Sequence, residues 1–175
     1  MKAARFLVAT LTVAGVGAAC VTVASVRAQE MGQEAEPVQW SLAASASDGS
    51  PVRKGTAVIA HLHAVIKPGW HIYSLYEEPG GPTAMRITVP TREPFAIGGD
   101  FDLPPPRSGI DPGFERETHF YTGDVVVTIP LRATRKTAVP VAVDVFYQAC
   151  NRESCLRPTV AHLTAAVVKA QEEQR

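Results

Sequence analysis

The chain has 175 residues, of which 46% are hydrophobic and 19% charged, and its 17 basic residues balance its 17 acidic residues. Without an excess of positive charge, the sequence offers no basic surface for nucleic acid and no polybasic patch for an acidic membrane. The length suits one domain that buries a substantial core.

Residues 1–28 have the organisation of a secretory signal peptide. Lys2 and Arg5 precede an apolar run rich in Ala and Val, and the small residues ending at Ala28 predict cleavage after that position. The apolar run is also long enough to span a bilayer, so membrane anchoring by an uncleaved signal is an alternative. Lipidation at Cys20 is a third possibility, although "GAA" before it lacks the usual branched apolar residue. We expect a periplasmic or otherwise exported protein.

Cleavage after Ala28 changes both the charge and the cysteine content. It removes three basic residues and no acidic ones, which leaves 14 basic and 17 acidic residues. It also removes Cys20, so the exported chain keeps Cys150 and Cys155 alone. An even number of cysteines in an oxidising compartment favours a disulfide between them.

The exported chain is predicted to be all-β. Residues 29–37 are polar and lack hydrophobic periodicity, which predicts a flexible leader, and residues 171–175 form a polar tail. Between them, residues 38–170 contain seven alternating segments rich in Val, Ile, Thr and aromatic residues and separated by Gly and Pro. The predicted strands are Val38–Ala44, Thr56–Ile66, Trp70–Tyr76, Ala84–Pro90, Asp124–Thr134, Val139–Ala149 and Thr159–Val168. Seven short strands in one small domain indicate an antiparallel β-sandwich.

Two segments interrupt the strand pattern. Glu77–Thr83 is rich in turn residues, and the Pro-rich segment Gly98–Phe120 is predicted to be one long loop. A loop of that length in a compact domain is usually functional or disordered. Its apolar side chains need a surface against which to pack, and they are Phe101, Leu103, Ile110 and Phe114.

Cys150 and Cys155 flank a predicted four-residue turn, Asn151–Ser154, between the last two strands. Opposed residues of an antiparallel pair lie about 4.5–5.5 Å apart between Cα atoms, which is within the disulfide range. The bond would close a short ring, and the chain-entropy model assigns it about 2 kcal/mol. A disulfide on a turn at the end of a sheet adds little stability to the fold, but its position near solvent suits reaction with another thiol.

Two other interpretations of the cysteines stay open. A surface disulfide without chemistry fits the spacing as well. A metal site is less consistent with the sequence, because there is no second cysteine pair, and alternating His61 and His63 on a strand are typical of a polar outer face. We therefore expect no metal and no cofactor.

Four segments together resemble the N-terminal periplasmic domain of the thiol:disulfide interchange protein DsbD, a transmembrane reductase. They are Lys67–Tyr76, Gly81–Pro90, Phe120–Leu131 and Val145–Pro158, and they follow the family's order over nearly the whole exported chain. The last segment, "VFYQACNRESCLRP", is the most specific. The resemblance implies an immunoglobulin-like sandwich with a redox-active cysteine pair.

The resemblance also implies a function. It indicates a protein thiol:disulfide oxidoreductase or electron carrier that uses thioredoxin-like periplasmic proteins as electron donor or acceptor and proceeds through mixed disulfides. Cys150 and Cys155 match the active pair, and the expected roles are attack on partners for Cys150 and resolution for Cys155. The family's membrane-spanning and thioredoxin-like parts are not found in this sequence, so we expect either that a separate membrane protein supplies the electrons or that the domain has been put to another use.

The family has a cap loop with an aromatic residue over the disulfide. The segment "DPGFERE", Asp111–Glu117, occupies that position and makes Phe114 the expected cap. Candidates for assisting proton movement are Asp111, Glu115, Tyr147 and Tyr73. The alternative function is a non-catalytic immunoglobulin-like binding module with a structural disulfide.

Overall fold

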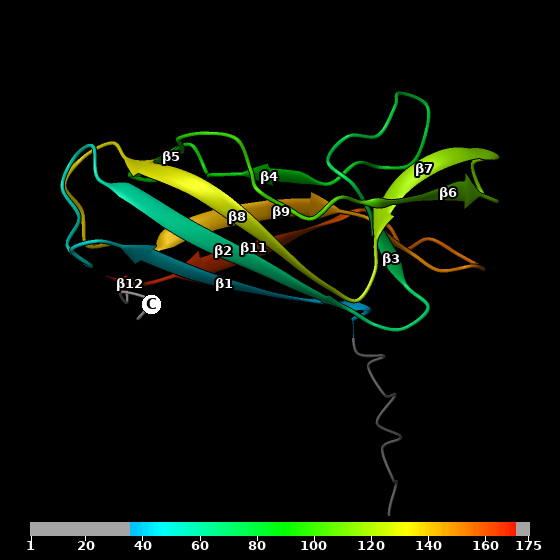
Figure 1. Cartoon of the computed structure of the whole chain (residues 1–175), viewed down its shortest axis with the longest axis horizontal. Coiled ribbons are helices and arrows are strands. Elements are labelled where there is room, and N and C mark those ends of the chain that lie inside the picture. The colour runs from blue at the N-terminus through cyan, green and yellow to red at the C-terminus, as the bar shows by residue number, and fades with distance from the viewer. Residues whose placement is uncertain (1–35, 171–175) are drawn as a thin grey trace, which may run out of the picture. The chain divides into compact units, whose positions relative to one another are not determined.

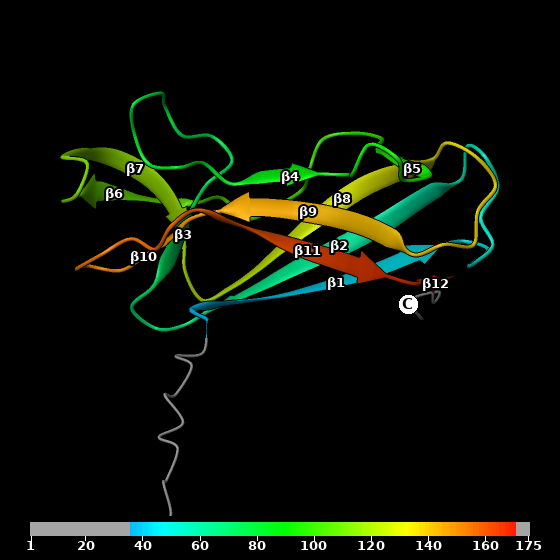
Figure 2. The same cartoon turned by 180° about the vertical axis from the view of Figure 1, so that it is seen from behind.

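The computed structural model describes residues 36–170, which form twelve β-strands and no helix (Figures 1 and 2). The predicted signal peptide at 1–28, nearly all of the predicted leader at 29–37 and the predicted tail at 171–175 lie outside the described residues. No helix long and apolar enough to cross a membrane occurs within residues 36–170.

The larger layer is a five-stranded sheet with the order β12-β1-β2-β8-β5. Its strands are β12 (Val167–Lys169), β1 (Val38–Ala46), β2 (Ala57–Ile66), β8 (Asp124–Ala133) and β5 (Phe95–Ile97). Buried and exposed residues alternate along β2 and β8, as the period-two pattern predicts. The outer face of β2 carries His61 and His63, whereas Leu62 between them is fully buried.

The opposing layer is a three-stranded sheet with the order β11-β9-β4. It consists of β11 (Thr159–Ala165), β9 (Val141–Tyr147) and β4 (Arg86–Thr88). Val141, Val143 and Val145 of β9 are completely buried, and each such side chain contributes about 1.5–3 kcal/mol relative to exposure. Figures 1 and 2 show the two layers face to face, which confirms the immunoglobulin-like sandwich. All sheet pairs are antiparallel except β1 with β12.

A third sheet lies at one end of the sandwich and has the order β10-β3-β7-β6. Its strands are β10 (Ala149–Cys150), β3 (His71–Tyr73), β7 (Arg116–Tyr121) and β6 (Arg107–Asp111). The prediction of one long loop over Gly98–Phe120 is therefore wrong. Residues 107–121 form a β-hairpin, whose strands are largely polar because one side faces away from the core, so the alternation is weak.

The rest of that segment anchors the hairpin to the sandwich. Phe101 and Leu103 pack against the core, and the Tyr121 hydroxyl donates a hydrogen bond of 3.2 Å to the Pro104 carbonyl. Ile110, in contrast, is 75% exposed. The hairpin is thus fixed at its base, and its tip projects beside the cysteine turn.

Candidate functional site

The turn between the two cysteines is held by its own hydrogen bonds. The Asn151 side-chain oxygen accepts bonds from the amides of Glu153 (2.9 Å) and Ser154 (2.8 Å), and the Asn151 amide donates to the Ser154 carbonyl (2.9 Å). Leu156 N donates to Ala149 O at 2.9 Å, just outside the turn. The turn is therefore organised by hydrogen bonds that do not involve the sulfur atoms.

Cys150 and Cys155 form a disulfide, with their Cα atoms 4.0 Å apart. They oppose each other in an isolated antiparallel bridge, as the hairpin prediction required, although the separation is shorter than the predicted 4.5–5.5 Å. The two residues differ sharply in burial: Cys150 is 1% exposed, whereas Cys155 is exposed. One end of the bond is therefore closed to solvent and the other is open.

One face of the end sheet gathers the polar residues of the site. Ile72 of β3 points into the core, so His71 and Tyr73 on either side of it share the other face. Cys150 of β10 stands opposite His71 in the strand register. Phe120 of β7 lies on the same face, with its ring 5.2 Å from that of His71.

Asp111 connects this face to the tip of the β6–β7 hairpin. Its Oδ2 accepts a 2.8 Å hydrogen bond from the Tyr73 hydroxyl, and its Oδ1 accepts bonds from the amides of Gly113 (2.8 Å) and Phe114 (3.3 Å). The Phe114 ring meets that of Tyr73 edge-on at 6.1 Å. Phe114 and Cys155 line one small hollow, so the expected cap residue lies beside the exposed cysteine.

Burial and the negative charge nearby change the acid–base properties of two residues. Burial, reinforced by the hydrogen bond to Asp111 and the carboxylates of Asp111 and Glu77, raises the pKa of Tyr73 far above its ordinary value. Tyr73 therefore stays protonated and acts as a hydrogen-bond donor. Burial lowers the pKa of His71, and the carboxylate of Asp111 opposes that shift.

The remaining predicted residues lie apart from this group. Tyr147 belongs to the hydrophobic core, where its ring packs edge-on against Trp40 at 5.1 Å, and burial raises its pKa. Glu115 is exposed in the hairpin turn and has a positive φ of 53°. The structure thus gathers Tyr73, Asp111 and Phe114 near the cysteines, and it gives Tyr147 a packing role.

His71 is the residue that sequence reasoning missed. Its Nε2 atom is buried, has no hydrogen-bond partner and lies 3.9 Å from Asp111 Oδ2. The sequence did contain a weak signal for a special role, because His71 is a polar residue next to two buried ones in a strand. Its pairing with Cys150, however, depends on strands nearly eighty positions apart.

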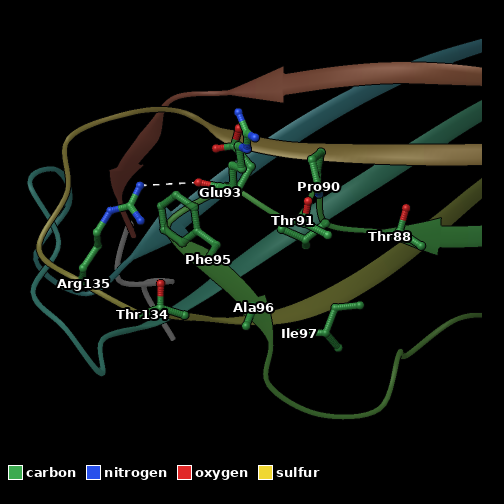
Figure 3. A pocket seen from close by; sticks show the side chains of 11 residues that line it. Thr88, Pro90, Thr91, Glu93, Phe95, Ala96, Ile97, Thr134 and Arg135 are labelled. Atoms are coloured by element: carbon green, nitrogen blue, oxygen red, sulfur yellow. Dashed lines mark hydrogen bonds between the residues drawn. The ribbon is translucent and has the colours of Figure 1, made fainter.

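A second hollow lies at the opposite end of the sandwich, beside β5. Phe95 forms part of its wall, and Arg135 donates a 3.4 Å hydrogen bond to the main-chain oxygen of Arg92. Figure 3 shows Phe95 and Arg135 among the lining residues. This hollow is remote from the cysteines, and no cysteine or histidine lines it. We therefore do not assign a second catalytic or redox site to this hollow.

Comparison with known proteins finds one matching family and two similar solved structures. The family model described as "Thiol:disulfide interchange protein DsbD, N-terminal" matches residues 39–166. A reduced DsbD N-terminal domain from Neisseria meningitidis is 13% identical over 71% of this chain and 83% of its own, with a TM-score of 0.45. The N-terminal periplasmic domain of ScsB from Proteus mirabilis is 21% identical over 74% of this chain and 46% of its own, with a TM-score of 0.50. A search of curated proteins finds no match.

Proposed function

The chain belongs to the family of the N-terminal domain of the thiol:disulfide interchange protein DsbD, and we propose that it exchanges disulfides with periplasmic partner proteins through Cys150 and Cys155. The observation that carries the proposal is the asymmetric disulfide. One cysteine is exposed, its partner is buried, and the turn that joins them is organised by hydrogen bonds that do not involve the sulfurs.

The asymmetry assigns a role to each sulfur. A partner thiolate attacks along the axis of the S–S bond, and attack on Cys155 approaches from the side away from buried Cys150. The new bond joins the partner to Cys155, the electron pair of the broken bond goes to Cys150, and that sulfur takes up a proton. This proposal reverses the roles expected from the resemblance, because buried Cys150 is screened from a partner.

The second half of the reaction completes the exchange. A second thiol of the partner attacks the partner's own sulfur in the mixed disulfide and releases Cys155, so that two electrons have entered this protein. In the opposite half-cycle, the Cys155 thiolate attacks a client disulfide, and Cys150 then attacks Cys155 and releases the reduced client. We propose that thioredoxin-like periplasmic proteins act as its electron donor or acceptor.

Two further parts of the proposal concern the cap and the compartment. Phe114 lines the hollow beside Cys155, so we propose that it screens the sulfur from small oxidants and moves aside for a docked partner. The proposed periplasmic location rests on the signal pattern of residues 1–28 and agrees with the periplasmic location of the ScsB domain.

The test is the reduction potential of the Cys150–Cys155 pair, measured in glutathione buffers of defined ratio. A value near about −200 mV supports exchange with periplasmic partners. A value below about −300 mV is typical of a structural disulfide and would favour the non-catalytic binding module instead.

A further inference from the structure

The cross-strand neighbour of the buried cysteine is a histidine. Cys150 of β10 and His71 of β3 are directly opposed in an antiparallel pair. Opposed residues in such a pair project to the same face, with Cβ atoms about 4.5–5.5 Å apart. The side chains of His71 and Cys150 therefore leave the backbone side by side, on the face of the sheet that also carries Tyr73.

The surroundings of His71 leave one ring nitrogen without a partner. Its Nε2 atom is buried and unpaired, and the nearest carboxylate oxygen, Asp111 Oδ2, is 3.9 Å away and already accepts the Tyr73 hydroxyl. The rings of Tyr73 and Phe120 lie 5.1 and 5.2 Å from the imidazole. Buried polar atoms normally have partners, so an unpaired one on a residue that stands opposite Cys150 calls for an explanation.

We propose that His71 transfers the proton of Cys150 during disulfide exchange, an inference that rests on the proposed function. When Cys150 resolves a mixed disulfide, neutral His71 accepts the Cys150 thiol proton. The Cys150 sulfur then bonds to Cys155, the bond between Cys155 and the partner breaks, and the partner leaves as a thiolate that takes its proton from water. In the reverse direction the imidazolium of His71, charged by a proton from water, returns it to Cys150 as that sulfur departs.

The charges around His71 suit a base that holds a proton only briefly. Burial lowers the pKa of His71 and favours the neutral, proton-accepting form, while the carboxylate of Asp111 stabilises the imidazolium when it forms. Tyr73 stays protonated and does not compete for the proton. His71 also lines a hollow together with three cations, which oppose formation of the imidazolium: Lys67, Arg107 and Arg152.

The first experiment compares His71→Gln with wild type and with His61→Gln, a matched change on the outer face of β2. Oxidation of the reduced protein by oxidised glutathione is followed from pH 5 to 9, with the resolving step separated from the first attack by rapid acid quench. We expect His71→Gln to slow resolution at pH 7 by about tenfold or more and to remove one inflection from its pH profile. His61→Gln should behave as wild type. A wild-type pH profile in folded His71→Gln overturns the inference and leaves the proposed function intact.

The second experiment needs no variant, so a failure of His71→Gln to fold cannot mask the answer. The imidazole of His71 is titrated by NMR in the oxidised and the reduced wild-type protein. The pKa of His71 should change on reduction, because Cys150 then carries a thiol proton that the imidazole can accept. Identical titration in both states overturns the inference. A wild-type protein that reacts with neither oxidised glutathione nor dithiothreitol overturns the proposed function as well.

Discussion

The hydroxyl of Tyr73 donates a 2.8 Å hydrogen bond to Oδ2 of Asp111, and this contact joins the strand beside Cys150 to the turn that carries Phe114. The same carboxylate organises the turn through its other oxygen, which accepts the Gly113 and Phe114 amides. The raised pKa of Tyr73 keeps the donor proton in place at physiological pH. The position of the cap is therefore coupled to the strand that faces the disulfide.

Tyr73→Phe removes this contact and should lower the free energy of unfolding. Hydrogen bonds to charged groups contribute about 1.5–3 kcal/mol, and Asp111 would lose one of its partners. Tyr121→Phe is the matched control, since it removes a hydrogen bond to a neutral carbonyl and should cost about 1 kcal/mol. Urea denaturation measures both. Equal losses would show that the carboxylate adds nothing beyond an ordinary hydrogen bond.

Phe114→Ala should expose the disulfide to small thiols. The side chain lines the hollow next to Cys155, so its removal should speed reduction by dithiothreitol several-fold. Ile110→Ala is the control, because that residue lies in the same hairpin and is already 75% exposed. A Phe114→Ala protein that is reduced at the wild-type rate would exclude a screening role for this ring.

The two single cysteine variants should differ in their reaction with oxidised glutathione. Cys150→Ala leaves an exposed thiol at Cys155 and should form a stable mixed disulfide, because no second thiol remains to release it. Cys155→Ala leaves a thiol at 1% exposure and should react at least about tenfold more slowly. Mass spectrometry follows both adducts. Faster reaction at Cys150 would restore the roles that the family resemblance implied.

Reduction of the disulfide should change the stability only slightly. The ring it closes is short, and the turn keeps the bonds of Asn151, so the free energy of unfolding should fall by about 2 kcal/mol or less. Chemical denaturation with and without reductant measures the difference. A protein that unfolds on reduction would contradict a reversible redox role for the disulfide and would favour a structural one.

His71 should make the oxidised protein less stable in mild acid. Its folded pKa is lowered while the unfolded value stays near about 6.5, so the unfolded state binds more protons between these two values. Stability should therefore fall as the pH drops below about 6.5. His71→Gln should lose this part of the pH dependence, and His61→Gln should keep it. Denaturation curves from pH 7.5 to 5 show whether the two variants differ.

The main strands could be predicted because each has one buried face. Along β2 and β9 every second residue is buried, and this alternation is visible in the sequence. β5 and β12 are three residues each, too short to show a period of two. The hairpin β6–β7 escaped prediction because its register depends on main-chain pairing between largely polar residues.

The site was predictable in part for a similar reason. Cys150 and Cys155 are close in sequence, so a turn suffices to bring them together, and the structure pairs them. Tyr147 is close to Cys150 in sequence too, but it joins the core, where Trp40 provides the contact. Nothing near Cys150 in the chain reveals His71, because their proximity comes from the pairing of β3 with β10.

The disulfide joins two residues that already lie at the two ends of one turn, which has a consequence for how the protein meets its partners. If opening the bond releases no segment, the proposed electron donor and acceptor would encounter essentially the same surface and would compete for one docking face. Only a few exposed atoms around Cys155 would then differ between the oxidised and the reduced protein.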